Sequence, residues 1–201
     1  GWFKDESLSV AEVVVPYEKN GAAALSILTE QTFFGGTLHD LREARQLTRL
    51  PLLRKDFIID AWQIAEAAAN GADVILLIAA CLSPEEVARL AAYARSLGLE
   101  VLLELHDEVE LAHICSDTEI IGINNRNLKD FSVDIDRSLR MAEKIPSGKV
   151  KVAESGISDV ATLQRFRQHG FEGFLVGERF MAAPDPGSAF GSLVQEWRKK
   201  V

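Results

Sequence analysis

Apolar and polar positions follow one another along this chain in two different patterns. Short runs such as residues 74–78 (VILLI) are apolar on both faces, which is typical of parallel strands buried between helices. Longer stretches between these runs carry helix-end signals: Ser83 and Pro84 open a predicted helix over 84–97, and Gly98 ends it. The plan repeats along the chain and predicts strands and helices in strict alternation.

The pattern predicts seven strands, over residues 24–28, 52–55, 74–78, 100–104, 120–123, 150–153 and 174–176. It predicts eight helices, over residues 9–20, 38–46, 61–70, 84–97, 107–114, 135–144, 158–169 and 187–200. Strict alternation predicts a parallel sheet with right-handed crossovers. A doubly wound open sheet and a closed eightfold barrel both satisfy this order.

The counts favour the barrel. Eight helices call for eight strands, the chain opens on a helix, and its 201 residues fall short of the ~250 typical of the fold. We therefore expect an α/β protein with a (β/α)8 TIM-barrel fold, truncated to seven parallel strands and eight helices. Residues 1–201 would form a single domain of helix 1 and strand 2 to helix 8, with strand 1 absent.

Polar side chains interrupt the ends of the predicted strands. Lys55, Glu104, Asn124 and Glu154 each end or follow an apolar run. If the strands are parallel, these side chains lie on one rim, where barrel enzymes place their active sites. A lysine there can donate a proton to a carbonyl oxygen and a glutamate can remove one. The alternative is a buried ion pair between Lys55 and Glu104 that has no chemical role.

Small residues follow the last two predicted strands. Ser155-Gly156 and Gly177-Glu178 lie just after them, where backbone N–H groups and a helix start can hold a phosphate. A glycine after a strand is also a common turn residue, so this phosphate site rests partly on analogy with other barrels.

The composition limits the classes of partner that the protein could bind. The chain has 22 basic and 30 acidic residues, a formal net charge of −8 and no basic run, which argues against nucleic acid or an anionic membrane as the main partner. No apolar run approaches the ~20 residues of a membrane span. Cys81 and Cys115 are expected to be structural thiols in a reducing cytoplasm.

The sequence also argues against cofactors. It contains no Gly-rich dinucleotide fingerprint or phosphate-cradling nucleotide loop, so we expect no nicotinamide, flavin or ATP. The pair Glu104 and His106 has the alternate spacing of metal ligands, but the four histidines do not cluster along the chain, and we expect no metal site.

Five segments together resemble the indole-3-glycerol-phosphate synthase family of tryptophan biosynthesis. They are residues 25–30 (LSILTE), 53–58 (LRKDFI), 122–128 (GINNRNL), 152–157 (VAESGI) and 174–178 (FLVGE). The resemblance extends over essentially the whole chain. It implies a cofactor-free barrel enzyme, a lyase that closes 1-(2-carboxyphenylamino)-1-deoxyribulose 5-phosphate to indole-3-glycerol phosphate, with loss of carbon dioxide and water.

The resemblance also implies roles for individual residues. Lys55 matches the general acid that protonates the ketone oxygen, and Glu104 matches the glutamate of the later dehydration. Asn124 matches a polar contact to the substrate, and Glu154 lies beside it. The positions that enclose the anthranilate ring or line the pocket are Phe34, Phe57, Leu76, Arg126, Leu128 and Leu175. The phosphate loops match Ser155, Gly156, Gly177 and Glu178, the last two through backbone N–H groups.

The chain departs from the family pattern at its start. Family members carry an amino-terminal extension and a first strand with a glutamate and a second lysine, followed by a Ser-Pro-Ser segment, and we expect this chain to begin after it. Such a loss predicts reduced or absent activity, and self-association through uncovered strand edges. Two alternatives follow: another phosphate-binding barrel, such as a phosphoribosylanthranilate isomerase, or a catalytically silent barrel that binds a phosphorylated ligand or self-associates.

Overall fold

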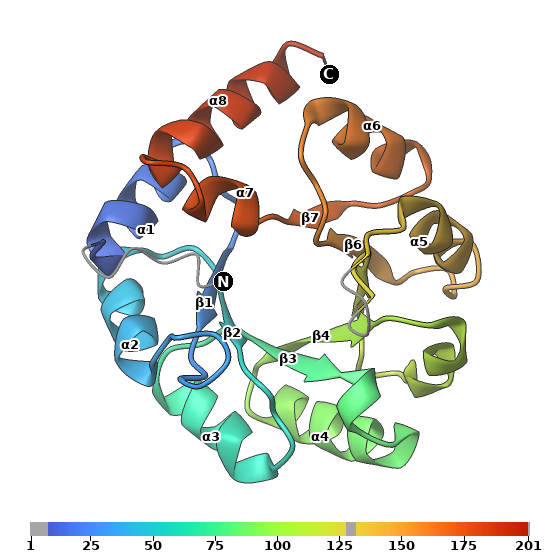
Figure 1. Cartoon of the computed structure of the whole chain (residues 1–201). Helices are drawn as coiled ribbons and strands as arrows, with labels where there is room; N and C mark the ends of the chain where they lie inside the picture. Colours follow the sequence, from blue (N-terminus) through green and yellow to red (C-terminus); the bar gives the residue numbers. More distant parts are fainter. Residues whose placement is uncertain (1–7, 128–131, 201) are drawn as a thin grey trace.

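A parallel sheet forms the centre of the molecule. The computed structural model describes residues 8–127 and 132–200. In these residues seven strands pair in chain order, each with the next strand along the sequence, and the helices surround the sheet (Figure 1). The strands are β1 (Leu25–Leu28), β2 (Leu52–Lys55), β3 (Val74–Ile78), β4 (Glu100–Leu105), β5 (Ile120–Asn124), β6 (Val150–Glu154) and β7 (Gly173–Leu175).

Helices follow the strands as the sequence predicts. The α-helices are α1 (Val10–Lys19), α2 (Leu38–Leu47), α3 (Ala61–Ala69), α4 (Pro84–Ser96), α5 (Ile135–Ala142), α6 (Val160–Gln168), α7 (Glu178–Met181) and α8 (Pro186–Arg198). The described residues also form the 3-10 helices η1 (Ala79–Cys81) and η2 (Glu108–His113). Polar caps define several starts: Ser9, Thr37, Asp60 and Ser83 each form a capping box with the residue three positions on.

The sequence prediction differs from the structure in the helices. The α-helix expected over residues 107–114 is the 3-10 helix η2, a segment of six residues of which none is fully buried, so little packing supports an α-helix there. The short helix α7 was not predicted, because its four residues are too few to show a helical period.

Successive side chains along each strand point alternately into the barrel and out toward the helices, and they form an inner and an outer apolar layer. On β2, Leu52 packs in the core between sheet and helices, whereas Leu53 packs in a second cluster inside the sheet. The inner cluster consists of Leu53, Val74, Leu76, Ile78 and Leu102. Side chains one step beyond this cluster, toward the carboxyl ends of the strands, therefore point into the mouth of the barrel.

The helices close the ring that the sheet begins. β1 and β7 are the two ends of the strand order. Helix α1 packs against both α2 and α8 and lies between them in Figure 1. The predicted α/β barrel with seven parallel strands is confirmed. In the described part of the chain, no helix has the length and apolar character needed to cross a membrane.

Candidate active site

Four polar side chains meet at the carboxyl ends of the strands. Lys55 ends β2, Glu104 lies one residue before the end of β4, and Asn124 and Glu154 end β5 and β6. Asn124 and Glu154 are direct partners in the sheet register, and all the strands are parallel. The predicted gathering of these residues on one rim is confirmed, although they are up to 99 positions apart in sequence (Lys55 to Glu154).

The Lys55 ammonium group lies between two carboxylates. Nζ is 3.2 Å from Oε2 of Glu104 and 3.6 Å from Oε2 of Glu154. Asn124 Nδ2 donates to Oε1 of Glu104 over 2.9 Å, so both oxygens of that carboxylate have a donor. The Glu104 and Glu154 side chains are 5% and 2% exposed, so these charges interact largely without solvent between them.

Burial and neighbouring charges shift the pKa values of the two glutamates in opposite directions. Burial alone would raise the pKa of Glu104, but Lys55 and the donors His106 and Asn124 hold it well below its usual range. Burial and the charge of Glu104 raise the pKa of Glu154 to about 8, against a partial lowering by Lys55. Burial alone would lower the pKa of Lys55, but the two carboxylates raise it. At neutral pH the group holds an ammonium, one carboxylate and one mostly protonated carboxyl.

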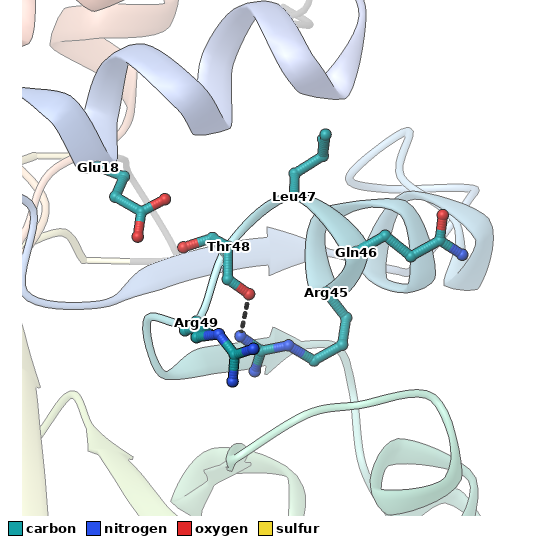
Figure 2. Close-up of a pocket in the computed structure, with 6 residues that line it drawn as sticks. All are labelled: Glu18, Arg45, Gln46, Leu47, Thr48 and Arg49. Atoms are coloured by element: carbon teal, nitrogen blue, oxygen red, sulfur yellow. Dashed lines mark hydrogen bonds between the residues drawn. The ribbon is translucent and has the colours of Figure 1, made fainter.

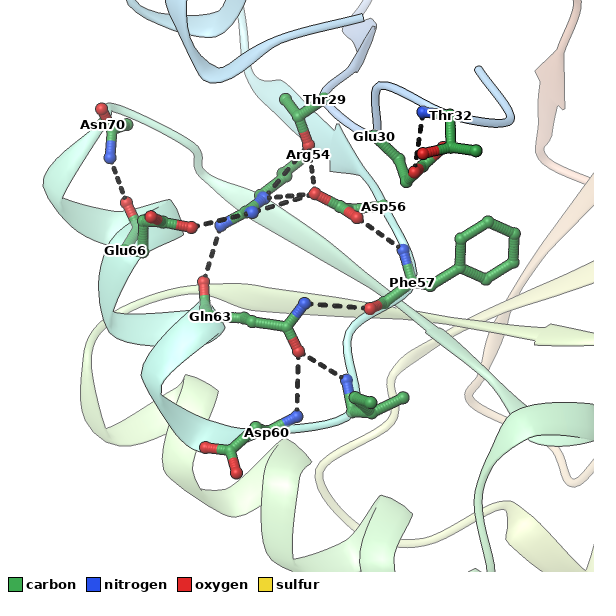
Figure 3. Close-up of polar contacts among 11 residues, drawn as sticks. Thr29, Glu30, Thr32, Arg54, Asp56, Phe57, Asp60, Gln63, Glu66 and Asn70 are labelled. Carbon is green, nitrogen blue, oxygen red and sulfur yellow. Dashed lines mark hydrogen bonds and ion pairs between the residues drawn. The ribbon is translucent and has the colours of Figure 1, made fainter. Parts of the chain in front are cut away.

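A buried network fixes the strand end that carries Lys55 (Figure 3). Arg54 points to the opposite side of β2 and is 3% exposed. Its guanidinium lies 2.9 Å from Oδ2 of Asp56 and 3.0 Å from Oε2 of Glu66 on α3, and it donates to Oγ1 of Thr29 over 3.1 Å. The other oxygen of Asp56 accepts from the backbone N–H of Phe57 over 2.8 Å. Of the two adjacent basic residues, Lys55 therefore belongs to the site, whereas Arg54 holds the strand end in place.

Aromatic rings line one side of the mouth. Phe34, from the β1–α2 loop, stacks on Phe57, from the β2–α3 loop, with ring centroids 5.1 Å apart and planes 9° apart. The Glu30 carboxylate accepts from the backbone N–H groups of Thr32, Phe33 and Phe34 and holds the first loop. Two loops that are distant in sequence thus supply one flat apolar surface.

The remaining predicted pocket residues fall in different places. Leu76 is fully buried in the inner cluster, and Leu175 packs against that cluster. Arg126 forms an ion pair with Glu178 on α7, which links the β5 loop to the β7 loop. The prediction for Leu128 lies outside the described residues.

The loop after β6 has an unusual backbone. Ser155 and Gly156 both have positive φ, 64° and 67°, and in the described part of the chain Ser155 alone among the non-glycine residues has this conformation. Asn125 supports the turn: its Nδ2 donates to the Ser155 carbonyl over 2.7 Å, and its backbone N–H donates to the Glu154 carbonyl over 2.9 Å. Strained backbone held by neighbouring contacts is common at functional sites. Gly177, after β7, is the residue that precedes α7.

Sequence reasoning missed two buried residues of this site. Asn125 was passed over because the polar loop that follows β5 gave no sign which amide would be buried. His106 was considered only as a metal ligand, but its Nε2 lies 3.0 Å from Oε1 of Glu104. Its place two positions after Glu104, on the same side of the strand, was the available signal.

Among the residues with described positions, no three His, Cys, Asp or Glu side chains converge as metal ligands would.

A groove at the other end of the barrel is not part of this site. It is lined by Glu18, Arg45, Gln46, Leu47, Thr48 and Arg49 (Figure 2). Arg45 is occupied by the carbonyl groups of Thr48 and Leu50 and by Asp73. The groove precedes the start of β2, at the amino end of a strand, where the barrel fold places stability rather than chemistry.

This chain has an acid–base cluster and two turns at the carboxyl ends of its parallel strands. TIM-barrel enzymes place their active sites in this way, and the chain belongs to that class by its fold and site. Residues 4–193 match the family model described as indole-3-glycerol phosphate synthase. The chain therefore belongs to the indole-3-glycerol phosphate synthase family, carboxy-lyases of tryptophan biosynthesis, and the predicted resemblance is confirmed.

Relatives from several bacteria support this assignment. The chain is 50% identical to an indole-3-glycerol phosphate synthase of Bacteroides thetaiotaomicron over 97% of this chain and 75% of the relative. It is 47% identical to the corresponding protein of a Polaromonas species over 91% of this chain and 70% of the relative.

Solved structures of other proteins share the fold. 3-Hexulose-6-phosphate synthase from Salmonella typhimurium superimposes with a TM-score of 0.75 at 15% identity and covers 98% of both chains. The tryptophan synthase A-subunit of Pyrococcus furiosus gives a TM-score of 0.70 at 15% identity, over 94% of this chain and 91% of that one. At such identities the likeness concerns the fold alone.

Proposed function

We propose that this chain closes 1-(2-carboxyphenylamino)-1-deoxyribulose 5-phosphate to indole-3-glycerol phosphate, with loss of carbon dioxide and water, and that Lys55 is its general acid. The chain's family acts on a phosphorylated small molecule. The observation that carries the assignment of Lys55 is its position, with Nζ between the carboxylates of Glu104 and Glu154 at the mouth of the barrel.

The protonation states support a division of labour among the charged groups. The raised pKa of Lys55 keeps it an ammonium at neutral pH, the form that can protonate the ketone oxygen as the aromatic ring attacks. Glu104 stays ionised and takes up a proton in the later dehydration. Glu154 is mostly protonated near pH 7 and acts as a hydrogen-bond donor to the substrate. Asn124 orients Glu104 and contacts the substrate.

The anthranilate ring binds against the stacked rings of Phe34 and Phe57. Leu76 and Leu175 form the apolar floor below it. Arg126 contributes a positive charge near the anionic substrate. We assign Leu128 to the pocket only because its position matches a pocket residue of the family. Aromatic surface beside a charged cluster suits a substrate that is aromatic at one end and anionic at the other.

The phosphate binds at the other side of the mouth, in the loops after β6 and β7. Ser155 and Gly156 supply backbone N–H groups and a hydroxyl. A side chain at position 156 would collide with Val133, because a Cβ atom placed there would lie 2.4 Å from Cγ1 of that residue. Gly177 and Glu178 contribute backbone N–H groups, because the Glu178 carboxylate would repel a phosphate.

Fluorescence of the indole product tests the proposal. The purified protein is mixed with the carboxyphenylamino-deoxyribulose phosphate, and in parallel it is titrated with indole-3-glycerol phosphate. Turnover with saturation supports the proposal. Product binding without turnover favours the silent barrel instead, and absence of both contradicts the assignment.

Two further parts of the proposal concern the cellular compartment of the protein and its self-association. We place the protein in the reducing cytoplasm, which is consistent with its two free cysteines, Cys81 and Cys115. We also propose self-association through the strand edges, since β1 and β7 each have one described neighbour in the sheet. Light scattering over a concentration series tests the latter.

A further inference from the structure

His106 occupies a position beside the acid–base cluster that none of the roles above uses. It is the first residue after β4 and lies on the same side as Glu104. Its side chain is nine-tenths buried, at 10% exposure, and Nε2 lies 3.0 Å from Oε1 of Glu104. Apart from this contact, neither ring nitrogen has a hydrogen-bond partner among the described residues.

The second ring nitrogen points toward another carboxylate. Nδ1 of His106 is 3.8 Å from Oε2 of Glu110 in η2, a side chain that is 13% exposed. The charged groups around the ring are thus Glu104 on one side and Glu110 on the other. A line of exchangeable groups runs from Lys55 through Glu104 and His106 to Glu110.

Another partly buried histidine behaves differently. Nδ1 and Nε2 of His113 lie 3.0 Å from the Glu110 carbonyl and 2.9 Å from the Leu82 carbonyl. That ring is fixed to the backbone as a structural group. The ring nitrogens of His106 face the two carboxylates instead, and burying an imidazole without backbone partners is costly unless another group uses it.

We propose that His106 is a positioning residue that acts through Glu104 and returns a proton to the acid–base cluster in each turnover. The inference rests on the proposed function. Loss of carbon dioxide from a carboxylate consumes one proton, so the enzyme is one proton short after each cycle. The deficit falls on Lys55, whose N–H bond breaks when an O–H bond forms on the ketone oxygen.

The path back is balanced at every atom. With Lys55 neutral, the main influence that lowers the pKa of Glu104 is gone, and its carboxylate becomes a better base. Glu104 passes the proton that it takes up in the dehydration to the departing hydroxyl group, which leaves as water, and is a carboxylate again. His106, once protonated by solvent, gives its Nε2 proton to the Glu104 carboxylate, and the carboxyl group so formed gives a proton to Nζ of Lys55. Lys55 is then an ammonium and Glu104 a carboxylate, and the neutral imidazole takes a new proton from solvent at the rim.

Two substitutions test this role, with His39→Ala as the matched control because His39 is 73% exposed and lies near Glu43 on α2. His106→Asn fills the same space without acid–base function and is expected to lower kcat about 10- to 100-fold, below the ~10²–10⁴ of a direct proton donor. KM and the melting temperature should stay near those of the parent. His106→Ala should regain at least about fivefold in kcat when free imidazole is added.

The outcomes separate this inference from the proposed function. An inactive parent protein speaks against the function itself. An active parent with a His106→Asn variant within twofold of its kcat overturns the role of His106. A loss in His106→Ala that imidazole does not restore overturns it as well, because a purely structural role gives that result.

Discussion

Gly122 leaves the space that the Glu154 carboxyl occupies. A Cβ atom built on Gly122, in the middle of β5, would lie 2.0 Å from Oε1 of Glu154 on the neighbouring strand. Glycine inside a strand is otherwise unfavourable, because it has no side chain to pack and loses the most conformational entropy. Its presence here is explained by the buried acid beside it.

Gly122→Ala should therefore displace Glu154 and destabilise the protein. Overpacking of this kind costs about 1–3 kcal/mol, measurable as a shift of the urea midpoint. In a Glu154→Ala background the collision is absent, and the cost should fall below about 0.5 kcal/mol. An equal cost in both backgrounds would show that the two residues do not share this space.

Glu154→Gln should make stability less dependent on pH. Burial and Glu104 raise the pKa of Glu154 from 4.5 to about 8, so the folded state holds a proton that the unfolded state has lost. The parent protein therefore loses stability as pH rises from about 4.5 to 8, and the variant lacks this loss. Urea unfolding at pH 5 and pH 8 should show the variant gaining roughly 1 kcal/mol or more on the parent over this window. A constant difference between the two proteins at both pH values would contradict the raised pKa.

Arg54→Met should be strongly destabilising, although Arg54 faces away from the site. The change leaves Asp56 buried, 6% exposed, without its cation. Breaking one partner of a buried pair costs about 3–5 kcal/mol. Arg165→Met removes an ion pair to Asp136 in which both side chains are well exposed, and it should cost no more than about 1 kcal/mol. Thermal unfolding of the two variants compares them directly, and similar costs would argue against the anchoring role of Arg54.

The position of the acid–base cluster could be predicted from the sequence because it depends on strand order alone. Once strands are parallel and alternate with helices, Lys55 and Glu154 must come to the same rim, whatever their separation along the chain. The apolar runs before them were enough to place that rim.

Contacts between loops could not be predicted in the same way. The ion pair of Arg126 with Glu178 depends on how the loop after β5 meets the start of α7. Arg126 lies in a loop and Glu178 opens a helix of only four residues, which is too short to show a helical period, so no spacing in the sequence relates the two positions. The opposite orientations of Arg54 and Lys55 needed the strand register, which a run of four residues does not fix by itself.

The central claim is that Lys55 supplies the proton for ring closure, and Lys55→Ala tests it most directly. Lys144→Ala is the control, since Lys144 is half exposed and pairs with Glu108 away from the cluster. In the fluorescence assay with substrate, kcat of Lys55→Ala should fall by about 10²–10⁴, while the affinity for indole-3-glycerol phosphate stays within about threefold of the parent. A Lys55→Ala variant that keeps the parent kcat would contradict the account and leave the contacts of Lys55 with Glu104 and Glu154 as a structural ion pair.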